Sequence, residues 1–175
     1  MLFVECKPDY SLATLMSSKK VEHAGNKSGV LRKLVRGSGV PNFENSMGMI
    51  DEDPQSSQNP DLRQFTELER LNKARIKVLH YRWLNNSLVV LCPRLEEWII
   101  AAAREAQIYL RDYDLPDDPV ALHEVINLRT DRFEDLVKAL VGRSSRIREL
   151  QRVLRESPRR RSMRHGHRST EGKRS

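Results

Sequence analysis

Short apolar runs alternate with amphipathic stretches through the first third of the chain. Apolar runs of this length predict buried strands, and a helical repeat of apolar positions predicts helices. Asp9 and Ser28 are the predicted N-caps of two helices. The predicted elements are a strand over 1–6, a helix over 10–17, a strand over 20–24, a helix over 28–35 and a strand ending at Asp51. This β-α-β-α-β order predicts an α/β fold with an open, mostly parallel sheet flanked by helices.

The second half of the chain predicts a hairpin followed by helices. A polar loop over 54–60 leads into a helix or partly ordered segment over about 61–72. Asn85-Asn86 is a favourable turn pair for a hairpin between two short apolar runs. The remaining predicted elements are strands over 75–83 and 88–92 and helices over 94–109, after Asp118, after Thr130 and over 144–154.

The net charge of +7 comes from the C-terminal end of the chain. Residues 143–175 hold 12 Lys and Arg against 3 Glu, which leaves 19 basic and 21 acidic residues in 1–142. The segment 157–175 has almost no apolar residues, so we predict a disordered basic tail there. Such a tail attracts phosphate backbones, and it fits a merely solubilising terminus equally well. The predicted nucleic-acid-binding residues are Arg159, Arg160, Arg161 and Arg164.

Length and composition narrow the class of protein. A chain of 175 residues with 38% hydrophobic residues fits one domain with a sizeable core. No apolar run approaches the roughly 20 residues of a membrane span, and the first residues lack the basic region of a secretory signal. Cys6 and Cys92 fit neither a disulfide framework nor a zinc spacing pattern. We therefore expect a cytoplasmic protein without a membrane partner.

Acidic residues stand where predicted strands end. Asp51-Glu52-Asp53 follows the apolar run 47–50, and its two Asp side chains are expected on one side of the strand. Carboxylates held this close repel each other, and a raised pKa or a bound divalent cation is the usual compensation. An acidic turn is the alternative for an isolated Asp-x-Asp. Glu5 and Asp9 follow the first strand, and Glu96 and Glu97 open the helix after the hairpin. Because ligands bind at the carboxyl ends of parallel strands, these acids together predict a cation site.

The order of these acids resembles that of the Toprim family, the metal-dependent domain of topoisomerases, primases and the OLD nucleases. The matching segments are Val4-Glu5-Cys6 with Asp9, Ile50-Asp51-Glu52-Asp53, Leu95-Glu96-Glu97-Trp98-Ile99, and Ala24-Gly25-Asn26-Lys27-Ser28, which is similar to a Gly-Gly-Lys-Ser motif of the OLD branch. The resemblance covers residues 1–108, followed by a helical extension of the same domain over 109–156. Cys6 departs from the family pattern because Gly usually stands there, and Asn26 rules out a P-loop.

The resemblance implies Mg²⁺- or Mn²⁺-dependent phosphodiester chemistry on nucleic acid, as in a nuclease. Oxygen ligands favour these hard cations over zinc. Glu5, Asp51 and Asp53 are the candidate ligands of one ion, and Asp9 and Glu96 those of a second. Glu5, Lys27 and Arg94 are the candidate catalytic residues, Lys27 and Arg94 by neutralising phosphate charge.

Other interpretations of the same residues stay open. The chain also fits a non-catalytic module that binds metal or nucleic acid in a larger complex, or a structural interaction domain. Glu52 and Glu97 are expected to face solvent or make structural contacts. His123 has no spacing partner, so we expect it to be a structural or surface residue.

Overall fold

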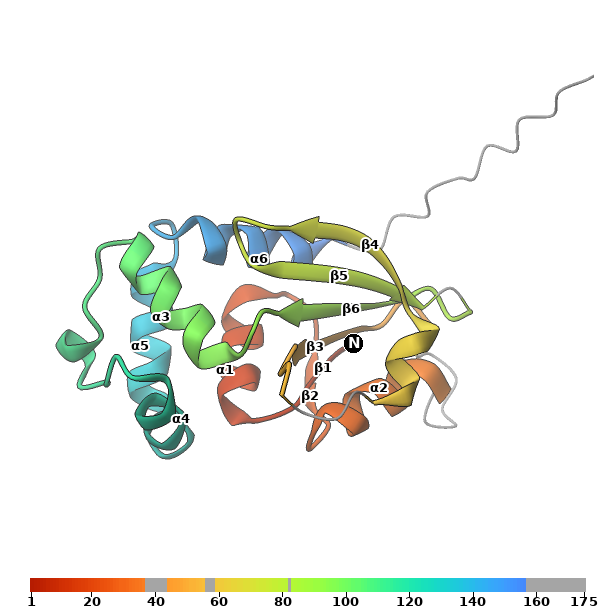
Figure 1. Ribbon diagram of the computed structural model, residues 1–175, viewed down its shortest axis with the longest axis horizontal. Helices are drawn as coiled ribbons and strands as arrows, with labels where there is room; N and C mark the ends of the chain where they lie inside the picture. Colours follow the sequence, from red (N-terminus) through yellow and green to blue (C-terminus); the bar gives the residue numbers. More distant parts are fainter. Residues whose placement is uncertain (37–43, 56–58, 82, 157–175) are drawn as a thin grey trace, which may run out of the picture.

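The described part of the chain forms one six-stranded sheet around which helices pack on both faces (Figure 1). The computed structural model describes residues 1–36, 44–55, 59–81 and 83–156. The strands lie in the order β2-β1-β3-β6-β5-β4, and the first four of these are parallel. Their bounds are β1 Leu2–Val4, β2 Val21–His23, β3 Met47–Asp51, β4 Thr66–Leu71, β5 Ile76–Tyr81 and β6 Asn86–Leu91.

Strands β4 and β5 extend the parallel sheet on one side as an antiparallel meander with β6. The helices and 3-10 turns are α1 Lys7–Met16, α2 Lys27–Arg36, η1 Pro60–Gln64, α3 Leu95–Glu105, η2 Leu110–Tyr113, α4 Pro119–Leu128, α5 Thr130–Leu140 and α6 Ser145–Arg155. The predicted α/β fold, with its mostly parallel sheet, flanking helices and extra C-terminal helices, is confirmed.

Strand alternation divides the core into two layers. In β1, the side chains of Leu2 and Val4 join one apolar cluster and that of Phe3 joins the other. The larger cluster also takes apolar side chains from α1, α3, α4, α5 and α6, whereas α2 covers the opposite face. Because α4, α5 and α6 share this larger core with the sheet, the segment 109–156 packs on the same hydrophobic core as β1, β3 and β6.

Helix α2 lies close against β3, and Gly48 makes this approach geometrically feasible. A Cβ atom at Gly48 would lie 2.6 Å from Val30 Cγ1 and 2.7 Å from Leu34 Cδ1, well inside van der Waals contact. The missing side chain therefore fixes how near α2 comes to the sheet. This spacing also sets the position of Lys27, the first residue of α2.

Two local predictions are wrong, and both concern helix boundaries. Asp9 is not the N-cap of its helix, because α1 begins at Lys7 with Cys6 as N-cap and accommodates Pro8 in its first turn. Ser28 lies inside α2, and the side chain of Asn26 instead accepts a hydrogen bond from the Gly29 amide at 2.8 Å. An Asn side chain caps a helix as well as Ser does, so sequence alone did not separate the two positions.

The prediction of a helix or partly ordered segment over about 61–72 is also wrong. A short 3-10 turn, η1, is followed by the edge strand β4. Most of β4 is exposed, so the strand has no buried face to impose an apolar and polar alternation on its sequence. Helix α3 ends at Glu105, four residues short of the predicted end. The hairpin around Asn85-Asn86 is present, with Asn86 already paired in β6.

Candidate metal centre

The carboxyl ends of β1 and β3 open into a cavity of about 440 Å³ between α1, α3, α2 and α4. All seven residues predicted as ligands or catalytic groups within the described chain line this cavity. They come from the β1–α1 connection, α1, the start of α2, the end of β3 and the start of α3: Glu5, Asp9, Lys27, Asp51, Asp53, Arg94 and Glu96. The fold thus brings together side chains that lie up to 91 residues apart, from Glu5 to Glu96.

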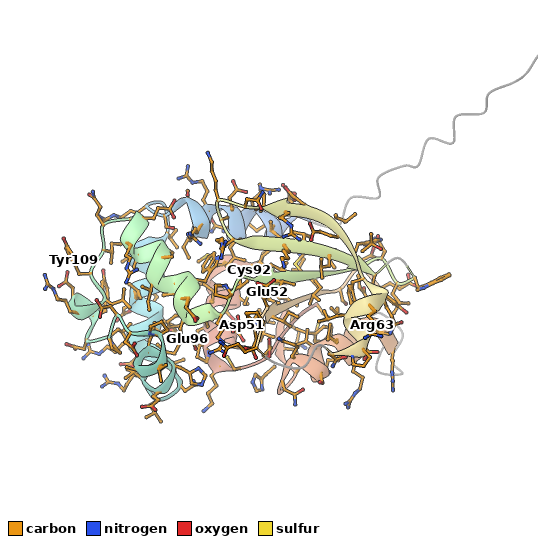
Figure 2. The ribbon with its side chains drawn as sticks, in the orientation of Figure 1. Asp51, Glu52, Arg63, Cys92, Glu96 and Tyr109 are labelled. Carbon is orange, nitrogen blue, oxygen red and sulfur yellow. The ribbon has the colours of Figure 1, made fainter. Side chains whose placement is uncertain are left out.

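Alternation at the end of β3 separates the members of the acidic triplet. Met49 joins the apolar cluster under α1, and Ile50 joins the cluster under α2. Asp51 consequently lies on the α1 side and lines the acidic cavity, whereas Glu52 lines a second, smaller pocket and forms an ion pair with Lys77. Figure 2 shows Asp51 and Glu52 at this end of the sheet, with Glu96 on the nearby helix. The prediction that Glu52 makes a structural contact is therefore confirmed.

Asp9 occupies the first turn of α1 and is almost completely buried. Its Oδ2 accepts hydrogen bonds from the Cys6 amide at 3.3 Å and from the Cys6 thiol at 3.1 Å. Burial, together with the charges of Glu5 and Glu96, raises the pKa of Asp9 to about 7, although the hydrogen bonds from Cys6 act in the opposite direction. The environment therefore disfavours a negative charge at Asp9 in the absence of a cation.

Asp51 lies in the same electrostatic environment. Burial and the charge of Asp9 raise the pKa of Asp51 to about 8, and Glu5 and Glu96 add to the shift. Burial likewise raises the pKa of Glu5, whose Oε1 accepts a hydrogen bond from the Asp51 amide at 3.0 Å. Within the described residues, Asp9 Oδ1 and Asp51 Oδ1 are buried and have no hydrogen-bond partner. Buried carboxylate oxygens without partners are costly, and a bound cation removes that cost.

The two candidate catalytic cations are engaged with neighbouring groups. Arg94 pairs with Asp53, with its Nε 3.1 Å and its terminal nitrogen 3.0 Å from Asp53 Oδ1. The ammonium group of Lys27 donates to the backbone carbonyl of Glu52 at 3.2 Å. Both residues line the acidic cavity and bring positive charge to its rim. They lie where the carboxylates alone would repel an anionic substrate.

Helix α4 contributes residues to the cavity that the sequence did not mark as site residues. His123 and Glu124 line it together with Pro119 and Val120. His123 Nδ1 lies 2.7 Å from Oε1 of the buried Glu96, so the imidazole holds this carboxylate in place. Glu97, which we expected to face solvent or make a structural contact, also lines the cavity. Its Oε2 is buried and unpartnered within the described part of the protein.

The donor set fits a hard divalent cation, but its side chains are not arranged as a finished coordination shell. Carboxylate oxygens are the ligands that Mg²⁺ and Mn²⁺ prefer. Among the described residues, no three His, Cys, Asp or Glu side chains are placed to hold one metal ion. Asp53 is held by Arg94 and Glu96 by His123. Metal binding therefore requires rotation of these side chains, while Asp9 and Asp51 already offer oxygens without hydrogen-bond partners.

Cys6 also lines the cavity, where its thiol contacts Asp9. Burial and the neighbouring carboxylate of Asp9 raise the pKa of the Cys6 thiol, so the group stays protonated and donates to Asp9. A thiol in this state is a poor nucleophile. Its contribution is to orient Asp9.

The four arginines predicted to bind nucleic acid, Arg159, Arg160, Arg161 and Arg164, lie outside the described residues, as does the whole predicted tail over 157–175. Within the described chain, no helix is long and apolar enough to span a membrane.

Comparison with known proteins gives no identity for the chain. No protein-family model, curated protein or solved structure matches it.

Proposed function

We propose that this protein is a Toprim-like enzyme that uses Mg²⁺ or Mn²⁺ to cleave phosphodiester bonds in nucleic acid. The observation that supports the proposal is the pair Asp9 and Asp51, whose buried oxygens lack partners among the described residues in a cavity lined by further carboxylates. Clustered carboxylates with raised pKa values mark functional sites more often than structural ones. The acids of the Toprim-like motifs are the ones that line this cavity, so the proposal takes over the metal-dependent chemistry that the resemblance implies.

The division of roles follows from where the side chains lie. Asp51, Asp53 and Glu5 belong to the ends of β3 and β1 and would hold one cation, and Asp9 with Glu96 would hold a second. Bound cations of this kind polarise the phosphoryl group and stabilise the attacking and leaving oxygens. The Cys6 thiol keeps Asp9 oriented, and the Asp51 amide keeps Glu5 oriented.

Lys27 and Arg94 act on the phosphate. They stand at the rim of the acidic cavity, and a phosphodiester that reaches the carboxylates passes within range of both. Arg94 exchanges its ion pair with Asp53 for the phosphate, which leaves the Asp53 carboxylate available to the cation. A basic tail containing Arg159, Arg160, Arg161 and Arg164 adds sequence-independent attraction for the nucleic acid.

A non-catalytic metal- or nucleic-acid-binding module is the second candidate function. The Arg94–Asp53 ion pair favours it, because a proposed catalytic cation neutralises a proposed metal ligand. In such a module the same cavity binds a cation, and no reaction follows.

Metal-dependent melting and cleavage assays separate these functions. We expect millimolar Mn²⁺ to raise the melting temperature of the native protein, because a ligand that binds only the folded state stabilises it. We expect Mn²⁺-dependent cleavage of DNA or RNA, lost in Glu5→Gln and unchanged in Glu149→Gln, whose half-buried side chain pairs with Arg152 on α6 and does not line the acidic cavity. A melting shift without cleavage supports the second candidate. No melting shift at millimolar Mn²⁺ contradicts both.

A further inference from the structure

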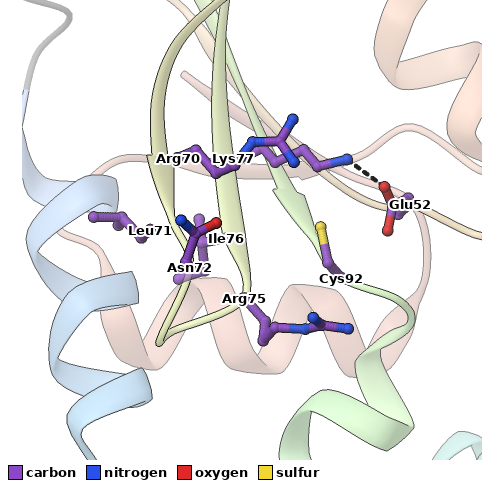
Figure 3. Close-up of a pocket in the computed structure, with 8 residues that line it drawn as sticks. All are labelled: Glu52, Arg70, Leu71, Asn72, Arg75, Ile76, Lys77 and Cys92. Atoms are coloured by element: carbon purple, nitrogen blue, oxygen red, sulfur yellow. Dashed lines mark hydrogen bonds and ion pairs between the residues drawn. The ribbon is translucent and has the colours of Figure 1, made fainter.

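A second pocket opens at the same edge of the sheet, beyond β6. It has a volume of about 120 Å³ and is lined by the side chains of Arg70, Arg75, Lys77, Glu52 and Cys92, among others (Figure 3). Arg70 lies in β4, next to its last residue, Arg75 belongs to the β4–β5 turn, and Lys77 lies in β5. Register places Arg70 opposite Lys77, so the two side chains lie on the same face of the sheet.

The charge of this pocket is opposite to that of the acidic cavity. Arg70, Arg75 and Lys77 give three positive charges against the single carboxylate of Glu52. Cys92 is neutral, because burial and the charge of Glu52 raise the pKa of its thiol to about 11. The lining therefore carries a net charge of +2, from three cations and one carboxylate.

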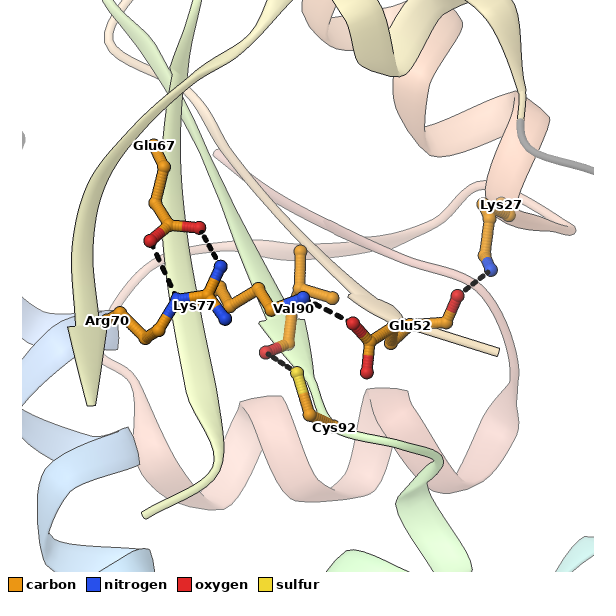
Figure 4. Close-up of polar contacts among 7 residues, drawn as sticks. All are labelled: Lys27, Glu52, Glu67, Arg70, Lys77, Val90 and Cys92. Atoms are coloured by element: carbon orange, nitrogen blue, oxygen red, sulfur yellow. Dashed lines mark hydrogen bonds and ion pairs between the residues drawn. The ribbon is translucent and has the colours of Figure 1, made fainter. Parts of the chain in front are cut away.

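The three cations differ in how far they are already neutralised. Arg70 forms a bidentate pair with Glu67, at 2.8 and 2.6 Å, and Lys77 pairs with Glu52 (Figure 4). Among residues 1–36, 44–55, 59–81 and 83–156, the guanidinium of Arg75 makes no hydrogen bond or ion pair, although its charge lowers the pKa of Glu52. The backbone of Arg75 is nevertheless anchored, since its carbonyl accepts a hydrogen bond from the Cys92 amide at 3.0 Å. Arg75 is thus a positioned cation with free donors.

The size of the pocket limits the chemistry of its ligand. A drug-sized molecule or a base with its sugar needs roughly 300–1,000 Å³, well above the volume here. A small tetrahedral anion fits, and arginine with lysine is the preferred donor set for phosphate oxygens. The carboxylate of Glu52 already pairs with Lys77, so one anionic oxygen of the protein itself lies among these cations.

We propose that Arg75, Arg70 and Lys77 form a binding site for a phosphate group. Glu52 shares Lys77 with the bound phosphate and weakens its binding by like-charge repulsion.

The position of the pocket connects it with the acidic cavity. Glu52 lines the phosphate pocket, and its neighbours Asp51 and Asp53 line the acidic cavity, so the two sites meet at the end of β3. In this respect the inference rests on the proposed function: the bound phosphate is one carried by a nucleic acid whose chain continues toward the carboxylates. A nucleic acid terminus and a free phosphate share the recognised chemistry, so the test contains both.

Binding is measured by isothermal titration calorimetry on the full chain in EDTA, where no divalent cation is available. The probes are inorganic phosphate and two short single-stranded oligonucleotides of one sequence, with a 5′-phosphate or a 5′-hydroxyl. The test variant is Arg75→Gln and the matched control is Arg111→Gln, which removes the same charge from a highly exposed site far along the chain. Arg75 is exposed, so its substitution leaves the core unchanged, and the melting temperature of each variant verifies this.

We expect Arg75→Gln to weaken binding by about tenfold or more, the cost of losing a charge-assisted hydrogen bond. Glu52→Gln should tighten binding, and Arg111→Gln should leave it within about twofold, as exposed charges contribute little. A preference for the 5′-phosphate identifies a strand terminus, equal binding of both oligonucleotides that Arg75→Gln weakens identifies an internal phosphodiester, and binding of inorganic phosphate alone identifies a free phosphate.

Three outcomes overturn the proposal. They are the absence of binding by all three probes, equal weakening by Arg75→Gln and Arg111→Gln, and no gain from Glu52→Gln. Because the titration excludes metal, a protein that fails here and still shows Mn²⁺-dependent melting retains the proposed function. A protein that binds phosphate and shows no Mn²⁺ response retains the phosphate site and loses the proposed function.

Discussion

The charge of Asp9 on α1 acts on Asp51 at the end of β3, and together with burial it raises the pKa of Asp51 to about 8. The pKa of Asp9 itself is raised to about 7. Among the described residues, no arginine or lysine forms an ion pair with Asp9 or Asp51 that would offset this repulsion. The metal-free fold therefore places two acids where ionisation costs stability, which is expected of a site that is completed by a cation.

The first prediction concerns the pH dependence of stability in EDTA. An acid whose pKa is higher in the folded than in the unfolded state binds more protons when folded, so stability falls as the pH rises between the two pKa values. With folded pKa values of about 7 and about 8, we expect the melting temperature to decline from pH 4 to pH 8 and then to level off. Saturating Mn²⁺ should flatten the decline. A melting temperature that rises from pH 5 to pH 8 in EDTA contradicts the prediction. The titratable and charged groups that line the cavity together with Asp51 are Glu5, Cys6, Asp9, Lys27, Asp53, Arg94, Glu96, Glu97, His123 and Glu124.

The second prediction concerns Asp51→Asn. An amide at this position keeps an acceptor for the Leu95 amide and removes the charge that burial and Asp9 oppose. We expect the variant to be more stable than the native protein in EDTA at pH 8, by more than about 1 kcal/mol, since each pKa unit corresponds to about 1.4 kcal/mol. The same variant should lose the stabilisation by Mn²⁺. Thermal melting with and without Mn²⁺ measures both effects.

Asp135→Asn is the matched control for this prediction. Asp135 is exposed on α5 and pairs with Lys138 at 3.3 Å, outside the acidic cavity. Its substitution should change stability by at most about 0.5 kcal/mol, as for other exposed pairs, and should preserve the Mn²⁺ response. If Asp51→Asn keeps the full Mn²⁺ response, Asp51 is not a ligand.

The parts of the fold that were predictable from sequence are those with a buried face. β1 and β3 are short apolar runs with side chains packed on both faces, and α5 and α6 carry regular apolar stripes that are buried as expected. For β4 the sequence predicts a helix or partly ordered segment, because the exposed position of the strand leaves its sequence free of alternation. The sheet register that identifies it as a strand comes from pairing with β5, which is not visible locally.

The residues of the candidate site also differ in whether the sequence predicts them. Acids at the ends of strands were predictable, because parallel strands deliver their carboxyl ends to one edge. His123 was not, since its approach to Glu96 depends on how α4 packs beside α3 after the intervening connection. The phosphate pocket likewise arises from the pairing of β4 with β5, and its residues Arg70, Arg75 and Lys77 show no motif. The alternation that sends Asp51 and Glu52 to opposite faces of β3 is a sequence signal for two separate pockets at the end of this strand.

The third prediction concerns Gly48→Ala in β3. The new Cβ atom would approach Val30 Cγ1 and Leu34 Cδ1 to 2.6 and 2.7 Å, so these side chains, or α2 with them, must shift away from the sheet. Overpacking of a core costs about 1–3 kcal/mol, and we expect a loss in this range by urea denaturation. Gly142→Ala provides a comparison, because nothing lies within 4 Å of its Cβ position and any loss there comes from the backbone at φ +79°, which alanine rarely adopts. If Gly48→Ala is as stable as the native protein, α2 is not held against β3 as described.

The fourth prediction concerns Trp98→Phe in α3. Trp98 is completely buried, and its indole N–H donates to the Ala74 carbonyl at 2.7 Å. This hydrogen bond ties the helix that carries Glu96 to the turn that carries Arg75, so Trp98 connects the acidic cavity with the phosphate pocket. Phenylalanine removes the donor and part of the volume, and we expect a loss of about 2–4 kcal/mol in urea denaturation followed by circular dichroism. Trp83→Phe is the control, because Trp83 is 70% exposed and its substitution should cost less than about 1 kcal/mol.

Beyond stability, we expect Trp98→Phe to weaken both Mn²⁺ and phosphate binding in protein that is still folded, since the two sites lose their common anchor. Unchanged affinity for both ligands in a folded Trp98→Phe variant would show that each site is positioned independently of the other.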